Sequence, residues 1–262
     1  MRNVHIDDHD NLKRDVVALG NDYPGGYLLS KHRHRRAQLL YGATGLMEVM
    51  TDSGCWIVPP QHAVWLPSGM EHRVKFMGVT TRSLYIEPAK ADDLNMGNAC
   101  KIIAVSSLLR QLLIEAVDLP PLYETQRDCA LMTLLLAEMA TMPRRAFDIP
   151  LPQEKRLLLK CHRFLNRPSV QAASVDWAAD LFMSESTFRR HFRRETGLSF
   201  SAWRQRACVV VSLARLVEGE AVNVIALEMG YESGSSFSTM FRRVTGQSPS
   251  HYLPPAQTRR GT

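Results

Sequence analysis

The sequence predicts a two-domain α+β protein, in which an antiparallel β-barrel with trailing helices precedes an all-α domain. Three observations support this fold class. Short apolar runs separated by turn residues fill 27–88, leucines at helical spacing follow over 104–142, and a helical segment near residue 190 recurs 49 positions later. The 262 residues are enough for two modest domains that each bury a core.

The barrel prediction depends on the even spacing of short apolar runs. These runs cover residues 37–41, 46–50, 56–58, 64–66, 74–76 and 83–86. Turn-forming residues separate them, for example at Gly45, Pro59 and Gly69. Because short strands at regular spacing are typical of an antiparallel barrel or sandwich, we assign about 27–88 to such a fold.

Two helices are predicted after the barrel, over 104–117 and 127–142, with Pro120 and Pro121 between them. Their apolar positions are Leu108, Leu109, Leu112, Leu113, Leu131, Leu134, Leu135 and Met139. One face of this pair is expected to pack on the barrel. The apolar stripe is wider than that packing needs, so it also predicts a surface for a second copy of the chain and hence a homodimer.

A proline-punctuated linker at 143–152 predicts the domain boundary, with the barrel and its helices in 1–150 and a helical domain in 151–262. Beyond it the pattern is helical throughout. The expected helices cover 153–165, 175–181, 184–194, 199–217, 222–229 and 234–244, with a short turn at 249–252.

A duplicated segment dominates this helical domain. The stretch from Ser184 to Gly197 recurs from Ser233 to Gly246, with serine, two phenylalanines, an Arg-Arg pair, threonine and glycine at matching places. In each copy the two phenylalanines are four residues apart, so they lie on the same side of a helix and point toward the core. They are Phe188, Phe192, Phe237 and Phe241. The two serines are the expected N-caps.

Each duplicated helix follows a shorter helix across a tight turn, which is the arrangement of a helix-turn-helix. In the first unit, Ser174 is the expected N-cap of the shorter helix. Its expected apolar face consists of Val175, Ala178 and Leu181. The matching apolar positions of the second unit are Val222, Ile225, Ala226 and Met229.

The outward faces of the two long helices carry the candidate DNA-binding residues. They are Ser186, Arg189, Arg190 and Arg193 in the first copy and Ser235, Ser238, Thr239 and Arg242 in the second. Arginine reads guanine edges in the major groove, short hydroxyl side chains contact several bases, and outward arginines also hold phosphates. We therefore predict two recognition helices that enter successive major grooves of double-stranded DNA, about 34 Å apart.

The charge distribution agrees with DNA as the partner. Residues 153–262 hold 16 Lys and Arg against 9 Asp and Glu, a net charge of +7, whereas residues 1–152 hold 16 against 17, a net charge of −1. The excess positive charge therefore coincides with the duplicated helices, as expected for a domain that meets phosphates.

The helical domain resembles the DNA-binding domain of the AraC/XylS family of bacterial transcription regulators. The segment from Ile225 to Pro249 matches the family signature at most positions. The resemblance implies sequence-specific binding to promoter DNA as an activator or repressor, and contact with RNA polymerase if the protein activates. Two positions depart from the pattern: Phe182 replaces the usual glycine of the first turn, and Leu253 replaces a frequent arginine. The small hydroxyl residues of the second helix suggest that it positions the protein more than it selects sequence.

The N-terminal half carries a second pattern, which resembles the two motifs of cupin barrels. His32, His34 and Gln38 match His-x-His-x3-Glu with glutamine in place of glutamate, and a Pro-x-Gly-x-x-His motif ends at His72. If His32 and His34 lie on one strand, both project to the same face and can converge with His72. Three imidazoles and one oxygen suit a divalent metal, and without the carboxylate Zn or Ni is favoured over harder cations. The same residues also suit hydrogen bonds to an organic effector, or a solvated basic strand with Arg33, Arg35 and Arg36.

Composition and segment patterns narrow the remaining alternatives. The five cysteines are odd in number and form no Cys-x-x-Cys pair, which favours reduced thiols; they are Cys55, Cys100, Cys129, Cys161 and Cys208. The sequence shows neither a membrane span nor an apparent signal peptide, so we expect a cytoplasmic protein. We predict no enzymatic activity, because a DNA-tethered cupin metalloenzyme would have to work with Gln38 as its fourth ligand and without an obvious general base. A constitutive DNA-binding protein whose barrel only dimerises remains the alternative to an effector-responsive regulator.

Overall fold

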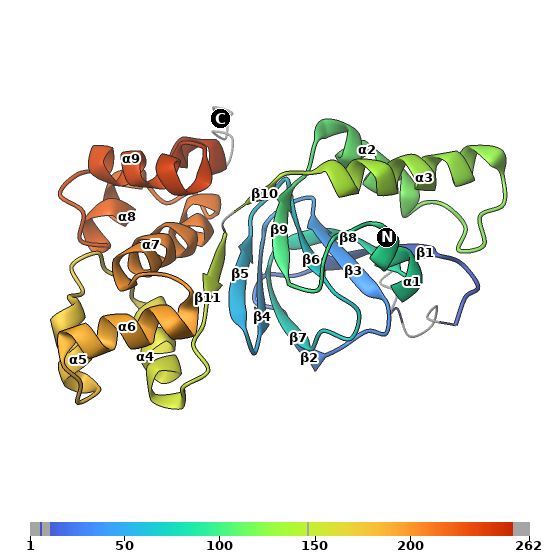
Figure 1. Cartoon of the computed structure of the whole chain (residues 1–262). Helices are drawn as coiled ribbons and strands as arrows, with labels where there is room; N and C mark the ends of the chain where they lie inside the picture. The colour runs from blue at the N-terminus through green and yellow to red at the C-terminus, as the bar shows by residue number, and fades with distance from the viewer. Residues whose placement is uncertain (1–5, 7–10, 146, 254–262) are drawn as a thin grey trace, which may run out of the picture. The chain divides into compact units, whose positions relative to one another are not determined.

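The computed structural model describes Ile6, residues 11–145 and residues 147–253 (Figure 1). The chain divides into two compact units, Met1–Asp148 and Ile149–Thr262. All five cysteines are free thiols. Within the described part of the chain, no helix is both long and apolar enough to cross a membrane.

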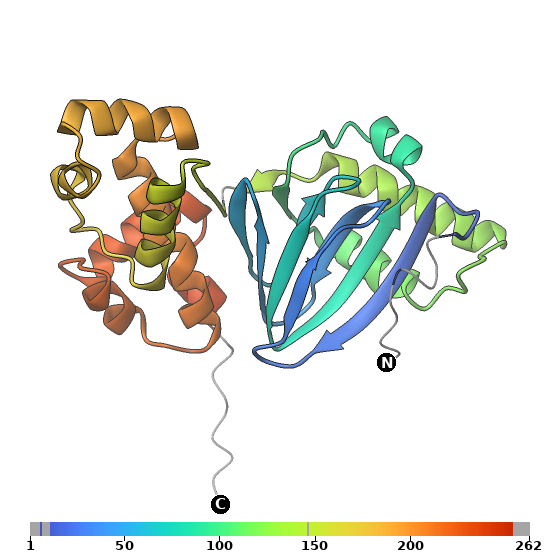
Figure 2. The same cartoon turned by 90° about the horizontal axis from the view of Figure 1, so that it is seen from below.

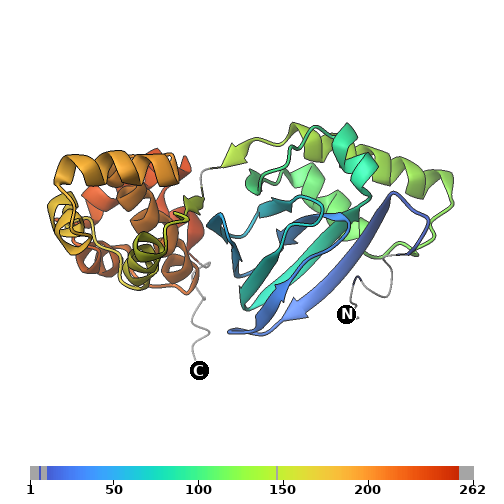
Figure 3. The same ribbon diagram turned by 60° about the horizontal axis from the view of Figure 1, so that its bottom comes forward.

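Two antiparallel sheets that face each other form the first unit (Figures 2 and 3). One sheet has the order β1 (Val16–Tyr23), β8 (Val79–Ile86), β3 (Ala37–Gly42), β6 (His62–Leu66), β9 (Lys101–Ala104) and β10 (Arg144–Arg145). The other contains, in order, β5 (Gly54–Val58), β4 (Leu46–Thr51), β7 (His72–Met77) and β2 (Leu28–His32). The short strand β11 (Asp148–Pro150) spans the division between the units. The predicted antiparallel barrel and the two-domain α+β class are therefore confirmed.

Strands β1, β9 and β10 of the first sheet lie outside the predicted range of 27–88. Strand β1 contains residues with poor strand propensity, such as Gly20 and Asp22, but it pairs with β8 over its whole length. Strand β9 occupies Lys101–Ala104, so the predicted helix start at 104 was wrong. Helix α2 (Ser107–Ala116) begins later because the Ser106 hydroxyl accepts the Leu109 N–H at 3.0 Å and caps it.

Helices α2 and α3 (Gln126–Thr141) pack on the outer face of the β1-to-β9 sheet (Figure 3), and a short helix α1 (Pro88–Asp93) follows β8. Leu113 and Leu135 from the helices join Leu39 and Leu84 from the sheet in one buried cluster. All of β3 is buried because alternate residues face opposite ways: Leu39 lies under the helices while Gln38 and Leu40 face the barrel interior.

After the end of β11, the described part of the second unit consists of helices and their connections (Figure 1). They are α4 (Lys155–Asn166), α5 (Ser174–Asp180), α6 (Glu185–Thr196), α7 (Phe200–Val217), α8 (Val222–Glu228), α9 (Gly234–Thr245) and a 3-10 turn, η2 (Pro249–Tyr252). The pairs α5–α6 and α8–α9 are the two helix-turn-helix units, and they lie on opposite sides of the long helix α7.

The duplicated phenylalanines anchor α6 and α9 as the spacing predicted. All four rings are fully buried. Phe192 packs against Trp203 of α7, at 5.5 Å between ring centroids, and Phe241 packs against Tyr252 of η2 at 5.6 Å. An aromatic cluster and a smaller aromatic group thus hold the inner faces of the two helices in place.

Matching threonines and glycines end both helices. Thr196 Oγ1 donates to the Phe192 carbonyl at 2.8 Å and Thr245 Oγ1 to the Phe241 carbonyl at 2.9 Å. Gly197 (φ 74°) and Gly246 (φ 81°) follow in the left-handed conformation that favours glycine. At the other ends, Ser184 and Ser233 are N-caps, as predicted.

The details of α5 differ from the sequence prediction. Its N-cap is Ala173, and Ser174 is the first helical residue, which makes no capping bond. Val175 is exposed, and the buried side chains are Trp177 and Ala178. Because the tryptophan meets the phenylalanines of α6, the buried face of α5 is turned relative to the predicted one.

Phe182 occupies the turn between α5 and α6 with φ 57°, a left-handed conformation like that of Gly230 (φ 80°) in the second unit. The departure from glycine therefore leaves the turn's handedness unchanged. Its cost is backbone strain, since a residue with a Cβ pays about 1–2 kcal/mol in this region. The phenyl ring is 89% exposed, so burial of the ring does not offset that strain.

We expect opposite effects from substituting these two turn residues. Phe182→Gly removes the strain and loses little packing, so the free energy of unfolding should rise by about 0.5–1 kcal/mol. Gly230→Ala should lower it by about 1–2 kcal/mol, because the new Cβ would also lie 3.0 Å from Ser169 Oγ. Urea unfolding of the full chain measures both; a stabilising Gly230→Ala would contradict this account.

Candidate functional site

The outer face of α6 presents arginines in two different states. Arg190 and Arg193 are exposed and form no ion pair with any residue that the structure describes. Arg189 is held within the fold: its Nη2 lies 2.6 Å from Glu185 Oε1 and 3.2 Å from Ser174 Oγ, on the neighbouring helix α5. The first recognition helix therefore has two arginines available for an anion and one that is clasped by a carboxylate.

A groove of about 850 Å³ runs beside these arginines. Four arginines line it, namely Arg189, Arg190, Arg193 and Arg204, together with Ser199 and Ser201. Positive charge and hydroxyl donors in one concave surface are what contacts to a phosphate backbone require.

The outer face of α9 has a different chemistry. Ser238 Oγ donates to the Gly234 carbonyl at 2.7 Å, and Thr239 Oγ1 donates to the Ser235 carbonyl at 3.1 Å. Because these hydroxyl protons are used inside the helix, the side chains offer acceptor lone pairs and the threonine methyl group outward. Such groups accept hydrogen bonds from base amino groups and contact thymine methyls.

In both α6 and α9, the two arginines of the Arg-Arg pair differ in the contacts they make. In α9, Arg243 donates to Gln205 Oε1 of α7 at 2.8 Å, while Arg242 is exposed and forms no ion pair within the described residues. In α6, Arg194 donates to His191 and lies 3.6 Å from Glu195, while Arg193 is exposed. The second arginine of each pair is thus tied into its own unit, and the first projects outward.

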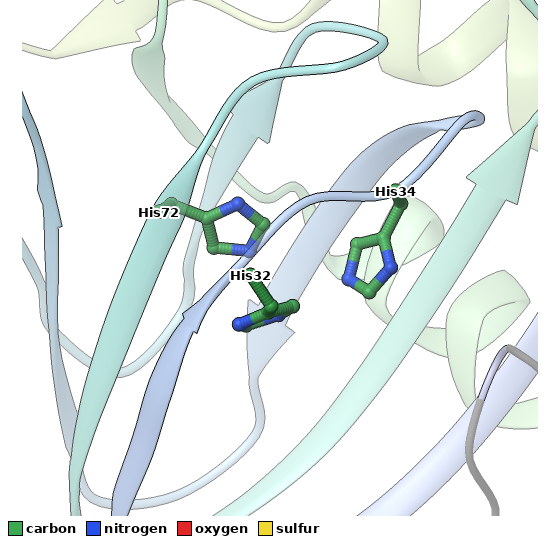
Figure 4. A group of neighbouring side chains, drawn as sticks. All are labelled: His32, His34 and His72. Atoms are coloured by element: carbon green, nitrogen blue, oxygen red, sulfur yellow. The ribbon is translucent and has the colours of Figure 1, made fainter.

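The three predicted barrel histidines converge on one cavity (Figure 4). Ring centroids of His32 and His72 are 4.3 Å apart, and one nitrogen from each of the three rings lies within 4.8 Å of the others. Small side-chain rotations bring such atoms to the separation of about 3.3 Å that tetrahedral zinc requires. The segment that carries His32 and His34 is solvated at alternate positions: Arg33 and Arg35 are exposed, whereas the two histidines are half-buried and line the cavity. Arg36, which follows them, is buried.

The histidines are placed by other backbone elements than the sequence predicted. Strand β2 ends at His32, so His34 lies in the connection to β3 rather than on the same strand. A bulge in β2 places an extra residue between Leu29, which pairs with Val74, and His32, which pairs with His72. Leu29 and His32 are three residues apart, and the bulge allows both to face the cavity.

The ring nitrogens of two histidines are fixed by backbone carbonyls. His32 Nδ1 lies 2.7 Å from the Ser30 carbonyl, and His72 Nδ1 lies 2.8 Å from the Met70 carbonyl. A carbonyl only accepts, so each Nδ1 carries the proton and donates. Each Nε2 then keeps its lone pair, which is the form of histidine that binds a metal ion.

The pocket also keeps two of the rings uncharged. Burial, together with the nearby His32 and His72, lowers the pKa of His34 to about 3. Burial likewise lowers the pKa of His72 to about 4. Both imidazoles are therefore neutral at physiological pH and available as ligands or hydrogen-bond partners.

Gln38 completes the polar end of the cavity. Its Nε2 donates to Tyr85 Oη at 3.0 Å and lies 3.4 Å from Ser83 Oγ, whereas its Oε1 is buried without a hydrogen-bond partner among the described residues. Three imidazoles and an unpartnered amide oxygen fit Zn or Ni, both of which accept nitrogen and neutral oxygen ligands.

The other side of the cavity was not predicted from the sequence. Tyr23, Tyr27 and Phe76 line it, and the rings of Tyr23 and Phe76 stack at 3.9 Å between centroids. Phe76 alternates with His72 and Val74 along β7, so strand periodicity could have placed it on the inner face. Tyr23 lies on the unpredicted strand β1.

Comparison with known proteins supports both the barrel domain and the helix-turn-helix domain. The AraC-like ligand binding domain family matches residues 15–140, and a helix-turn-helix domain family matches residues 177–254. The HTH-type transcriptional regulator NimR of Escherichia coli (strain K12) is 31% identical over 230 residues, which cover 85% of this chain and 81% of NimR. The chain therefore belongs to the AraC family of helix-turn-helix transcription regulators, which bind DNA.

Further similarities are more partial. The HTH-type transcriptional regulator RipA of Corynebacterium glutamicum is 34% identical over 105 residues, covering 39% of this chain and 31% of RipA. Among solved structures, ToxT from Vibrio cholerae with bound unsaturated fatty acid superposes with a TM-score of 0.36 at 13% identity, covering 91% of this chain and 94% of that one. The DNA-binding domain of AdpA in complex with a target DNA gives a TM-score of 0.32 at 31% identity, covering 35% and 84%. Overlaps this loose assign no function.

Releasing Arg189 from its carboxylate should strengthen DNA binding. Glu185→Gln removes the carboxylate that holds Arg189 in an exposed ion pair, so we expect a two- to fivefold gain in affinity for operator DNA. Fluorescence anisotropy at fixed salt measures it. Glu232→Gln, which removes a carboxylate in the turn of the second unit, is the matched control. An equal gain in affinity there would show a general charge effect and contradict a role for the Glu185–Arg189 ion pair.

The neutral histidines predict an acid-sensitive barrel. In metal-free protein, the unfolded chain takes up protons at His34 and His72 below about pH 6.5, while the folded chain takes them up only near the lowered pKa values of about 3 and about 4. The free energy of unfolding should therefore fall as the pH drops from 6.5 toward 4. Urea unfolding with a chelator tests this. His34→Gln should flatten the dependence, and His251→Gln on the second unit should not.

Proposed function

We propose that this chain is a sequence-specific transcription regulator that reads successive major grooves of promoter DNA with α6 and α9. The observation that carries the proposal is the duplication itself. Two helices share buried phenylalanine anchors, serine caps, threonine–glycine ends and one outward arginine each, Arg193 and Arg242. Repeated anchoring of this kind supports two equivalent insertions into DNA, one helical turn apart.

The two helices are proposed to contribute unequally to specificity. On α6, Ser186, Arg189 and Arg190 are the candidates for base contacts, since arginine gives bidentate contacts to guanine. On α9, Ser235, Ser238 and Thr239 are small, and two of their hydroxyl protons are already used within the helix. The second helix therefore serves mainly to position the protein, with Arg242 on a phosphate.

The barrel is proposed to sense a small molecule or metal ion at His32, His34, Gln38 and His72. Binding would shift the regulator between states that differ in DNA affinity, which requires that the effector prefer one of them. Three imidazoles that converge on a cavity of about 380 Å³ support sensing over the alternative of a purely dimerising barrel. The regulator would act in the cytoplasm, and an activator would also contact RNA polymerase.

Homodimerisation through α2 and α3 is part of the proposal. Leu108 on α2 is 48% exposed and Leu134 on α3 is 45% exposed, although the helices' other leucines pack on the barrel. Exposed leucines on a helical pair are a common feature of subunit interfaces.

Selection of bound sequences from random DNA tests the division of labour. We expect the parent to select a defined motif and Arg190→Ala to lose selectivity at one position of it, at a cost of about 1–3 kcal/mol. The triple variant Ser235→Ala/Ser238→Ala/Thr239→Ala should keep the motif and bind less tightly. Arg163→Ala, on α4 outside both recognition helices, is the control for lost charge. A triple variant that binds DNA without sequence preference would refute the positioning role of α9.

A further inference from the structure

The barrel cavity has two chemically distinct sides. It has a volume of about 380 Å³, within the range of small-molecule sites. One side presents the three histidines and the unpartnered Oε1 of Gln38. The other presents the apolar faces of Tyr23, Tyr27 and Phe76, whose rings lie 3.9–6.2 Å apart.

Among the described residues, the polar side offers no carboxylate. Its donors are three imidazoles and the carboxamide of Gln38. Apart from histidines, the charged residues that line the cavity in the described part of the chain are Asp22 and Arg33, whose charges are opposite and equal. The Asp22 carboxylate accepts a hydrogen bond from Thr80 Oγ1 at 2.7 Å and is not one of the converging donors. A divalent ion held by the three histidines and Gln38 would therefore keep its charge of +2, because none of these four side chains is a carboxylate.

An uncompensated double charge is expensive in a cavity with an apolar wall. Zinc ions held by three neutral histidines normally bind water as hydroxide or an anionic ligand in the remaining position, since this reduces the local charge. The cavity that these histidines line is large enough for an organic molecule, and its lining also includes the stacked rings of Tyr23 and Phe76.

We propose that the effector is a small organic anion, such as a carboxylate, that binds a histidine-held metal ion with its charged group and packs its apolar body against Tyr23, Tyr27 and Phe76. This inference rests on the proposed sensing function of the barrel and specifies the class of molecule sensed. Glutamine at position 38 is then what makes the site responsive, because a carboxylate there would satisfy the metal ion permanently and compete with the effector.

Charge selectivity tests this proposal most sharply. The full chain is loaded with Co²⁺, whose visible absorption reports on coordination, and titrated with benzoate and with benzamide, a neutral molecule of nearly the same shape. We expect benzoate to change the cobalt spectrum and to bind at least tenfold more tightly than benzamide. The metal-free chain should lose this preference. Equal binding of the two molecules would overturn the proposal.

Two variants separate charge from packing. Gln38→Glu should retain cobalt and weaken benzoate binding at least tenfold, whereas the neutral Gln38→Met should retain the preference for benzoate. Unchanged benzoate affinity in Gln38→Glu would also overturn the proposal.

The cobalt content of each protein and its affinity for DNA are measured in parallel. A chain that takes up no cobalt refutes the inference at its first step, yet the DNA-binding part of the proposed function stands if operator affinity is intact. Cobalt uptake and benzoate binding with no change in DNA affinity would instead refute sensing and leave the ligand site in place.

Discussion

The burial of two phenylalanines one helical turn apart is the interaction on which the DNA-binding unit depends. The polar face of such a helix does not by itself fix the rotation of the helix about its own axis. Phe188 and Phe192 fix that rotation for α6 by inserting into the aromatic cluster of Trp177, Phe200 and Trp203. Each fully buried phenylalanine contributes about 1.5–3 kcal/mol by leaving water, and the outward direction of the arginines follows from it.

The same constraint explains why the outward faces can differ. In α9, Phe237 and Phe241 provide the anchors, and Tyr231 and Tyr252 replace the tryptophans around them. Because anchoring depends only on the inner face, arginines can be present on one outer face and small hydroxyl residues on the other without a change of fold. The two copies therefore hold α6 and α9 by equivalent inner faces, while the residues on their outer faces can differ.

In the barrel the corresponding constraint is strand alternation, modified at one place. Alternation brings Gln38, Leu40, His72 and Phe76 to the interior. The bulge in β2 then brings His32 directly opposite His72, and the connection to β3 supplies His34. Burial keeps the rings of His34 and His72 neutral, so the same local geometry sets both the position and the protonation of these two histidines.

Residue spacing predicted much of this from the sequence. The phenylalanine pairs, the serine caps, the short strands and the convergence of three histidines all follow from periodicities of 3.6 and 2. What spacing missed was decided by partners distant in sequence. Strand β1 is held by its ladder with β8 despite its glycine and aspartate, and Trp177 turns α5 toward the phenylalanines of α6, leaving Val175 exposed. The bulge before His32 is visible only in its pairing with β7.

Methylation interference on a selected operator tests most directly whether α6 and α9 enter successive major grooves on one face of the DNA, since methylation of guanine N7 blocks major-groove contacts. We expect two groups of sensitive positions centred about 10 base pairs apart, of which the group nearer α6 disappears in Arg190→Ala. A single group, or two groups on opposite faces of the duplex, would contradict this expectation.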